Sequence, residues 1–217
     1  MKKNSQMIRI PALIALATAL GSYSSFAAPV TLTFEGLGDN APIGNYYNGG
    51  AGGNYGISFG ADSLALIQGS AGGSGNFANA PSGVTVAYFL SGPGDVMNVA
   101  AGFDTGFSFF YADQVGFTGS VAVYSGLDGT GSLLATLSLP STPSPYTVFV
   151  PVGVTFAGSA ESVVFGGAAN FIAFDNVTLG SETPGGAGVP DGGATALLLG
   201  MGLTGLVGFS RRMAVSQ

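Results

Sequence analysis

The sequence predicts an all-β fold, an antiparallel β-sandwich of the jelly-roll type. Between residues 28 and 180, no long stretch repeats its apolar residues with the 3.6-residue period of an amphipathic helix. Short segments rich in Val, Phe, Tyr and Thr recur there instead, separated by clusters of Gly, Pro, Asn and Asp that are typical of turns. Many short strands joined by such turns favour two packed antiparallel sheets.

Nine segments of this region are predicted strands, and several alternate apolar and polar residues as half-buried strands do. In chain order they cover residues 30–34, 55–59, 83–89, 107–112, 120–125, 133–139, 146–152, 161–167 and 171–179. We expect the first and the last of these segments to pair, because the first and last strands of a jelly roll commonly lie together near its closing edge.

Residues 36–83 differ in composition, with 14 glycines among 48 residues. Such a stretch forms a poor core, so we expect long surface loops with a strand or two; the alternative is low-complexity disorder. Four aromatic residues, Tyr46, Tyr47, Tyr55 and Phe77, lie here among Asn side chains. Aromatic rings and amides together can bind sugars, so these four form the predicted ligand-binding rim, unless they are ordinary loop residues.

Charge is distributed very unevenly along the chain. The five basic residues lie at the two ends, whereas ten of the eleven acidic residues lie between residues 28 and 190. Without His or Cys the chain cannot form a Ser-His-Asp triad, a Cys nucleophile or the usual zinc site. Without Lys or Arg between residues 10 and 210 it has nothing to neutralise phosphates, which excludes nucleic acid as a partner. Carboxylates, amides and aromatic rings remain, and they suit calcium and sugars.

The first 27 residues have the three parts of a secretory signal peptide. Lys2, Lys3 and Arg9 form a positive segment, residues 10–20 form an apolar one, and small residues precede a cleavage site. We expect signal peptidase to cut after Ala27. The alternative is an uncleaved anchor, but an 11-residue apolar run is too short to cross a hydrocarbon core of about 30 Å.

The C-terminal end carries a second signal with three parts. Residues 181–188 are rich in Gly and Pro and are expected to form a flexible spacer after the domain of residues 28–180. Residues 194–210 carry no charge, and as a helix they would be about 25 Å long. Arg211 and Arg212 follow on the side that the positive-inside rule assigns to the cytoplasm. A C-terminal membrane helix with an exported domain is therefore predicted.

Residues 189–213 also resemble a family of bacterial sorting tails. The Val189-Pro190-Asp191-Gly192 motif, the apolar stretch and the closing Arg211-Arg212 pair are similar, in that order, to the VPD variant of the PEP-CTERM class. The resemblance implies recognition and removal of the tail by an exosortase-type membrane enzyme. It further implies release or attachment at the surface of a bacterium that makes exopolysaccharide. The alternative is a plain anchor that is never processed.

Two acidic residues have a topological reason to meet. Glu35 follows the first predicted strand, and Asp175 lies within the last one. Their surroundings resemble the galactose-binding-like jelly rolls of carbohydrate-binding modules, where an acid at each of these strands holds a structural calcium. The resemblance implies that Glu35 and Asp175 are calcium ligands. The alternative is that both face solvent independently.

These features together lead to an expected function and two alternatives. The first expectation is a non-catalytic protein of the cell surface or extracellular matrix that binds exopolysaccharide with calcium support. The second is a glycoside hydrolase with a pair of carboxylates, the only catalytic chemistry that the composition allows. The third is a purely structural matrix protein. No catalytic residue is assigned.

Overall fold

The computed structural model describes residues 28–92, 94–167 and 169–185. The signal peptide, residues 186–188 of the spacer and the sorting tail lie outside these residues. The strands are β1 (Val30–Leu32), β2 (Asn48–Gly50), β3 (Gly53–Asn54), β4 (Ile57–Phe59), β5 (Ser63–Ile67), β6 (Thr85–Phe89), β7 (Gly94–Phe103), β8 (Gly106–Asp113), β9 (Gly119–Tyr124), β10 (Leu133–Leu139), β11 (Val150–Thr155), β12 (Ala160–Gly167) and β13 (Ile172–Leu179). Two single-turn 3-10 helices, η1 (Gly69–Ala71) and η2 (Leu127–Gly129), complete the described elements.

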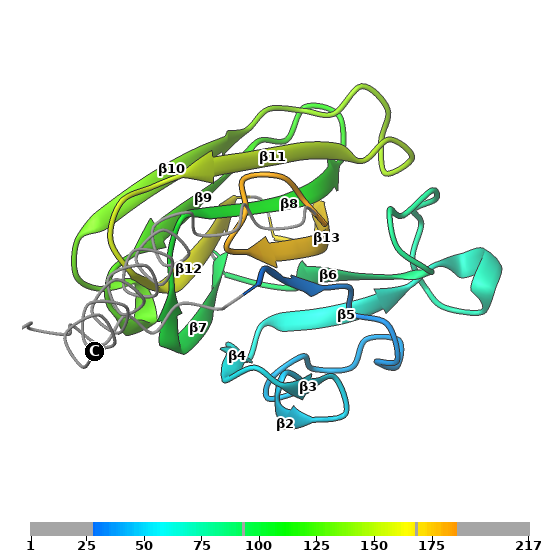
Figure 1. Ribbon diagram of the computed structural model, residues 1–217. Coiled ribbons are helices and arrows are strands. Elements are labelled where there is room, and N and C mark those ends of the chain that lie inside the picture. Colours follow the sequence, from blue (N-terminus) through cyan, green and yellow to red (C-terminus); the bar gives the residue numbers. More distant parts are fainter. Residues whose placement is uncertain (1–27, 93, 168, 186–217) are drawn as a thin grey trace, which may run out of the picture.

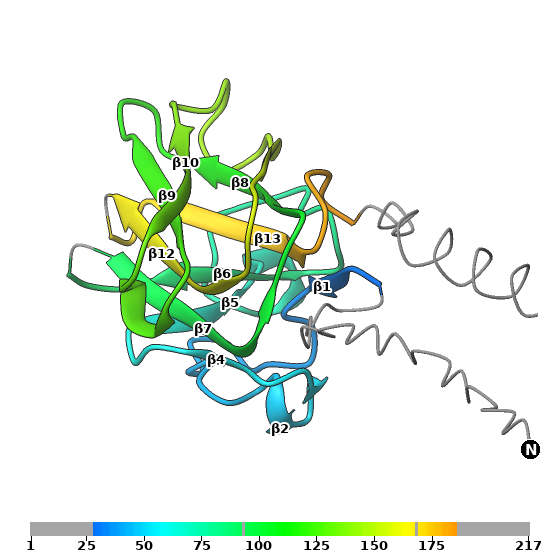
Figure 2. The same cartoon turned by 60° about the vertical axis from the view of Figure 1, so that its left-hand side comes forward.

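The strands form two packed antiparallel sheets, as the sequence predicts (Figure 1, Figure 2). The first sheet has the order β11-β8-β13-β6-β5, and β1 pairs with the end of β13. The second sheet has the order β10-β9-β12-β7-β4, and β2 pairs with β3 in a separate hairpin. The expected pairing of first and last strands is confirmed by Val30, which lies opposite Leu179.

The core between the sheets is unusually rich in phenylalanine. Phe107 and Phe109 of β8 are fully buried, because residues at alternate positions of a strand face the same side. From the other sheet, Phe165 packs edge-on against Phe174, with ring centroids 5.0 Å apart. Edge-to-face contacts of this kind stabilise aromatic cores beyond the area that they bury. The core alone can therefore hold the domain together without disulfides.

The structure has more strands than the sequence predicts. Strands β5 and β7 were not expected, and the glycine-rich residues 36–83 contain four short strands instead of one or two. The ten-residue β7 starts at a glycine, and Asn98 interrupts its apolar run. Strand β7 is nevertheless paired on both sides, by β12 and β4. Pairing partners from distant parts of the chain thus outweigh a weak local strand pattern.

Strand β13 organises the parts of the molecule that bear on function. Its first residues, Ile172 and Ala173, border a hollow on the outer face of the first sheet. Asp175 lies in its middle, and Thr178 near its end contacts the segment that leads toward the tail. The border of the hollow, one acid of the Glu35–Asp175 pair and the contact with the segment that leads toward the tail therefore follow one another along a single strand.

Candidate functional site

Glu35 and Asp175 are brought together by one short segment before β6. The backbone N–H and the hydroxyl of Ser82 donate to the two carboxylate oxygens of Asp175, each at 2.8 Å. The N–H groups of Val84 and Thr85 donate to Oε1 of Glu35, at 3.0 and 2.7 Å. The two acids that the sequence singled out thus bind neighbouring parts of the same turn.

Gly83 makes this arrangement possible. Its φ angle is +49°, a left-handed conformation that costs glycine nothing. A Cβ atom at this position would overlap the Glu35 carboxyl group. Any side chain on residue 83 would therefore displace Glu35 from the turn.

The charges of Glu35 and Asp175 favour the binding of a cation beside them. Burial raises the pKa of Asp175 to about 6, against hydrogen bonds from Ser82 and Asn176 that lower it, and the charge of Glu35 raises it further. No Lys, Arg or His occurs between residues 10 and 210 to offset these charges. A bound cation would favour the ionised form of both carboxylates.

The groups around the pair suit calcium in part. Calcium takes oxygen ligands from carboxylates, amides and backbone carbonyls. Asn176 follows Asp175 at a register shift of β13, and its Oδ1 atom is buried without a hydrogen-bond partner. Among the described residues, no group of three or more acidic side chains clusters. Calcium here would depend on two carboxylates, with amide or carbonyl oxygens completing its shell.

Two of the rings predicted as a ligand rim support the Glu35 segment instead. The hydroxyl of Tyr47 accepts a hydrogen bond from the Phe34 N–H at 2.7 Å, and the hydroxyl of Tyr46 donates to the Glu35 carbonyl at 2.8 Å. The two rings pack edge-on, with centroids 5.0 Å apart. Tyr47 is only 5% exposed, so its ring offers no surface on which a sugar could stack.

The other two rim residues lie in different surroundings. Tyr55 is 43% exposed and lies beside Gly53 in the β2–β3 hairpin. Phe77 is 4% exposed and packs edge-on against Phe149. The predicted rim is therefore not one surface: Phe77 belongs to a separate cluster with Phe149, and the side chains of Tyr47 and Phe77 are almost fully buried.

A hollow that the sequence did not reveal lies on the outer face of the first sheet. Its cavity volume is about 40 Å³, and it opens to solvent. Its floor consists of apolar side chains from the sheet and from the segment that covers the sheet. Its lining residues are Leu66, Asn76, Phe77, Tyr88, Tyr146, Asn170, Ile172 and Ala173. The half-buried Tyr146 and the exposed Asn76 and Asn170 combine an aromatic ring with amides, the composition that binds sugars.

Unusual backbone conformations position the rim of this hollow. Tyr146 and Asn170 both have positive φ angles, 54° and 65°. Such left-handed residues are uncommon outside glycine and concentrate at binding sites. The Tyr146 carbonyl accepts a hydrogen bond from Ala78 at 2.9 Å, and Asn79 donates to the Thr147 carbonyl at 3.1 Å. The two loops that border the hollow are thus bound to each other.

Asp113 anchors the loop that carries Tyr146. It is fully buried, and its Oδ1 atom accepts hydrogen bonds from the N–H and the hydroxyl of Thr142, at 2.6 and 2.8 Å. Burial, with a contribution from the Asp113 charge, raises the pKa of Tyr146, which keeps this phenol neutral. One overlooked signal for this loop is a tyrosine in a Pro-rich segment at residues 140–146.

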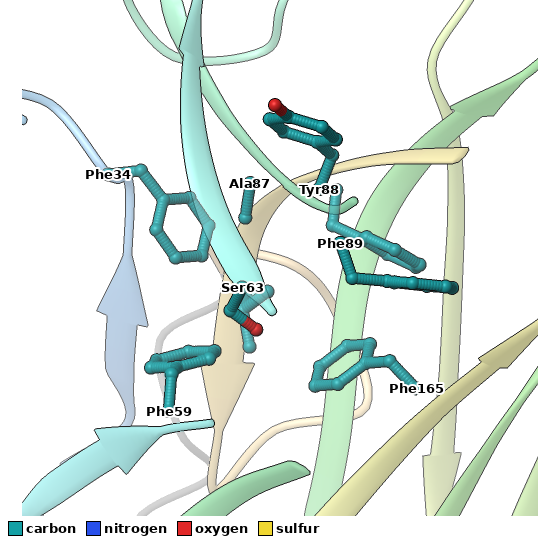
Figure 3. A pocket seen from close by; sticks show the side chains of 9 residues that line it. Phe34, Phe59, Ser63, Ala87, Tyr88, Phe89 and Phe165 are labelled. Atoms are coloured by element: carbon teal, nitrogen blue, oxygen red, sulfur yellow. The ribbon is translucent and has the colours of Figure 1, made fainter. Parts of the chain in front are cut away.

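A second hollow is a gap in the core. Its cavity volume is only about 10 Å³, and it is bordered mainly by aromatic side chains, with Ser63 as the polar exception (Figure 3). The hydroxyl of Tyr88 points away from the rings of Phe34, Phe59 and Phe89 in this view. That hydroxyl instead donates to Oδ1 of Asn40 at 2.7 Å. The core gap lacks the convergent polar groups of a ligand site.

Comparison with a family model confirms the sorting signal. Residues 188–213 match the model of the VPDSG-CTERM motif. This motif implies an exported protein that is processed at a membrane. Within the part of the chain that the structure describes, no helix is long and apolar enough to span a bilayer. The predicted membrane helix and both arginines lie outside that part.

Comparison with solved structures finds carbohydrate-binding modules. A family 6 module shares 19% identity with a TM-score of 0.38, covering 56% of this chain and 83% of the module. A module of Clostridium stercorarium in complex with cellobiose shares 15% identity with a TM-score of 0.39, covering 69% and 90%. The module of Cellvibrio mixtus lichenase 5A in complex with cellotriose shares 16% identity with a TM-score of 0.32, covering 55% and 86%. No curated protein matches the chain.

Proposed function

We propose that this protein is exported, is processed at its C-terminal tail, and binds extracellular polysaccharide through the hollow beside Tyr146. The observation that carries export is the sorting motif at residues 188–213. The observation that favours binding is the combination of a half-buried tyrosine with two exposed amides, Asn76 and Asn170, around an open hollow. Because the domain is acidic, it should repel acidic glycans, so we expect neutral polysaccharides as ligands.

Calcium at Glu35 and Asp175 has a structural role in this proposal. The pair lies on the turn that leads into β6, whose Tyr88 lines the hollow. Binding a cation there would relieve the cost of burying Asp175 and would rigidify the turn. The raised pKa of Asp175 and the unpartnered Oδ1 of Asn176 support this assignment.

The burial and the hydrogen bonds of the same two carboxylates disfavour a catalytic role. A glycoside hydrolase needs two acids about 5–10 Å apart that reach a sugar in a cleft. Asp175 is fully buried and accepts hydrogen bonds from Ser82, while Glu35 accepts them from Val84 and Thr85. Neither acid lines the hollow that we propose for the glycan. We therefore propose a non-catalytic protein.

An array of purified polysaccharides, probed with the exported protein with and without calcium, tests the binding proposal. We expect retention on at least one neutral polysaccharide and loss of that retention in a Tyr146→Ala variant. Absence of binding across neutral and acidic glycans would instead support a purely structural matrix protein.

Mass spectrometry of the mature protein tests the processing proposal. The exosortase-type enzyme is expected to leave a C-terminus near Asp191, and signal peptidase an N-terminus at Ala28. A mature chain that still ends beyond Arg211 and Arg212 would show a plain membrane anchor.

A further inference from the structure

A trough of small residues crosses three neighbouring strands of the first sheet. Gly153 of β11 and Thr178 of β13 lie opposite Ser108 of β8, on either side of it. Ser108 lies between the core-facing Phe107 and Phe109, so its side chain points to the outer face of the sheet. Ser108 and Thr178 are nevertheless fully buried. Something must therefore cover them from outside.

The cover is a strap formed by residues 181–185. The hydroxyl of Ser108 donates to the Ser181 carbonyl at 2.9 Å, and the Gly185 N–H donates to the hydroxyl of Thr178 at 2.9 Å. Hydrogen bonds thus fix both ends of the strap. The sequence predicts a flexible spacer over residues 181–188, and in the structure polar side chains of the sheet bind the backbone of the first five of these residues.

Glycines let the middle of the strap approach the sheet. A Cβ atom at Gly153 would overlap the Glu182 carbonyl oxygen, and a Cβ atom at Gly106 would lie 2.8 Å from the Glu182 nitrogen. Gly153 has an ordinary strand conformation, so its lack of a side chain serves this contact and not a turn. The trough is therefore shaped to receive the strap.

The strap also sets where the tail leaves the domain. Only residues 186 and 187 separate Gly185 from the sorting motif that begins at residue 188. An extended chain spans at most about 3.6 Å per residue, so Pro190 lies within about 18 Å of Gly185 while the strap is docked. If the strap were released as far as Gly180, that reach would double to about 36 Å. Docking therefore shortens the length of chain that separates the sandwich from the sorting motif.

We propose that the docked strap restricts the access of the membrane-embedded processing enzyme to the sorting motif, so that strap release is the step that exposes the tail. This inference rests on the proposed processing of the tail. Enzymes that act on peptides commonly bind several residues in an extended form, as an added strand does. While the strap is docked, only residues 186–188 lie between it and Val189, which is a short segment for such binding.

Two changes that act in different ways test this proposal in the producing cell. The first inserts five Gly and Ser residues after Gly185, which adds reach without touching the trough. The second is Gly153→Ala, which places a methyl group against Glu182. A pulse-chase experiment then measures the half-life of the tail on the full chain. We expect both changes to shorten it, and Gly153→Ala to do so by about fivefold, the factor that corresponds to one hydrogen bond of ordinary strength.

Matched controls separate strap release from general effects. The same insertion after Gly158, in an exposed turn with no contact near its Cβ position, should leave the half-life unchanged. Gly38→Ala should also have no effect, because its Cβ atom would meet only Ala41 at 3.8 Å. Unchanged or longer half-lives in both test variants would overturn the proposal. A tail that is never removed, even from the wild type, would overturn the proposed processing as well.

Docking itself has a direct measurement that does not depend on the processing enzyme. The chain has three glutamates, and Glu182 is the one in the strap. A Glu-specific endopeptidase acting on the full chain in detergent should cut after Glu182 slowly in the wild type and at least about fivefold faster in Gly153→Ala. Equal rates of cutting would show that the strap is not held by the trough.

Discussion

Glu35 and Asp175 hold the two halves of one turn, Asp175 through Ser82 and Glu35 through Val84 and Thr85. Gly83, between these partners, has no side chain and lies directly against the Glu35 carboxylate. The first strand, the last strand and the entrance of β6 are thereby joined at one point. At this point the charge of Glu35 and burial both raise the pKa of Asp175, so a bound cation would stabilise the ionised pair.

Calcium should raise the melting temperature of the exported domain. At a concentration about 100 times the Kd, a single site adds about 2.7 kcal/mol, which corresponds to a rise in Tm of about 5 to 10 °C for a domain of this size. Asp175→Asn and Glu35→Gln should each remove most of this rise in differential scanning fluorimetry. The same rise in both variants would contradict the assignment of the pair.

The effect of calcium should depend on pH in a direction fixed by Asp175. Its pKa is raised from 3.8 to about 6 in the folded domain, so without a cation its contribution to stability is present below pH 3.8 and is lost as the pH rises through about 6. Calcium favours the ionised form, so the calcium-induced rise in Tm should be small at pH 5 and large at pH 7. A rise of equal size at both values would count against Asp175 as a ligand.

A side chain at Gly83 should uncouple the two carboxylates. Gly83→Ala combines strain at a positive φ with an overlap on Glu35, so we expect lower stability and loss of the calcium response. Gly44→Ala is the matched control, since Gly44 has a similar φ of +44° and no atom within 4 Å of its Cβ position. The control should lose stability through strain alone and should keep its calcium response.

The two tyrosines beside the pair should affect stability and not sugar binding. Tyr47→Phe leaves the buried Phe34 N–H without its acceptor, which should cost about 1–3 kcal/mol in urea unfolding. Tyr46→Phe removes a half-buried hydrogen bond to the Glu35 carbonyl and should cost about 1 kcal/mol. A loss of glycan binding in either folded variant would restore the predicted rim.

The hollow can be tested with substitutions that spare the backbone. Asn170→Gly removes the amide at a position whose φ of 65° suits glycine, so the fold should tolerate it. Tyr146→Ala removes the ring and should weaken glycan binding about threefold to tenfold in titration calorimetry, the range of one aromatic contact. Asn170→Gly should weaken binding without lowering Tm. Unchanged affinity in both variants would place the glycan elsewhere.

The loop that carries Tyr146 should depend on a buried acid. Thr142→Val removes the hydroxyl that binds Asp113, which should cost about 1.5–3 kcal/mol because the acceptor is a carboxylate. The variant should also bind glycan more weakly, since the loop loses its anchor. Thr136→Val, at an exposed position of β10 outside this loop, is the control and should change neither property.

Much of the fold follows from local patterns in the chain. Residues 30–34 alternate apolar and polar residues, residues 171–179 are rich in Phe, Ile, Val and Thr, and the two segments do form the paired strands β1 and β13. Strand β7 was not predicted because glycines and Asn98 weaken its strand pattern. It forms because strands that are distant in the sequence pair with it on both sides. The proximity of Glu35 and Asp175 could be predicted from the topology of a jelly roll. The hydrogen bonds that Ser82 and Thr85 donate to these carboxylates could not be predicted.

The sequence by itself determined that this protein is exported, that it is a β-sandwich and that it has no positive charge between residues 10 and 210. Signals at the ends, strand periodicity and composition are local properties, and they can be read without knowing what any residue touches. The tertiary structure decided which aromatic rings are buried, which loops enclose the hollow and where the strap docks. Tyr47 and Tyr146 are both tyrosines in polar surroundings, but one is buried under Phe34 and the other borders an open hollow. Only the packing of distant strands separates the two, because burial is a property of the assembled sheets and not of the neighbouring residues in the chain.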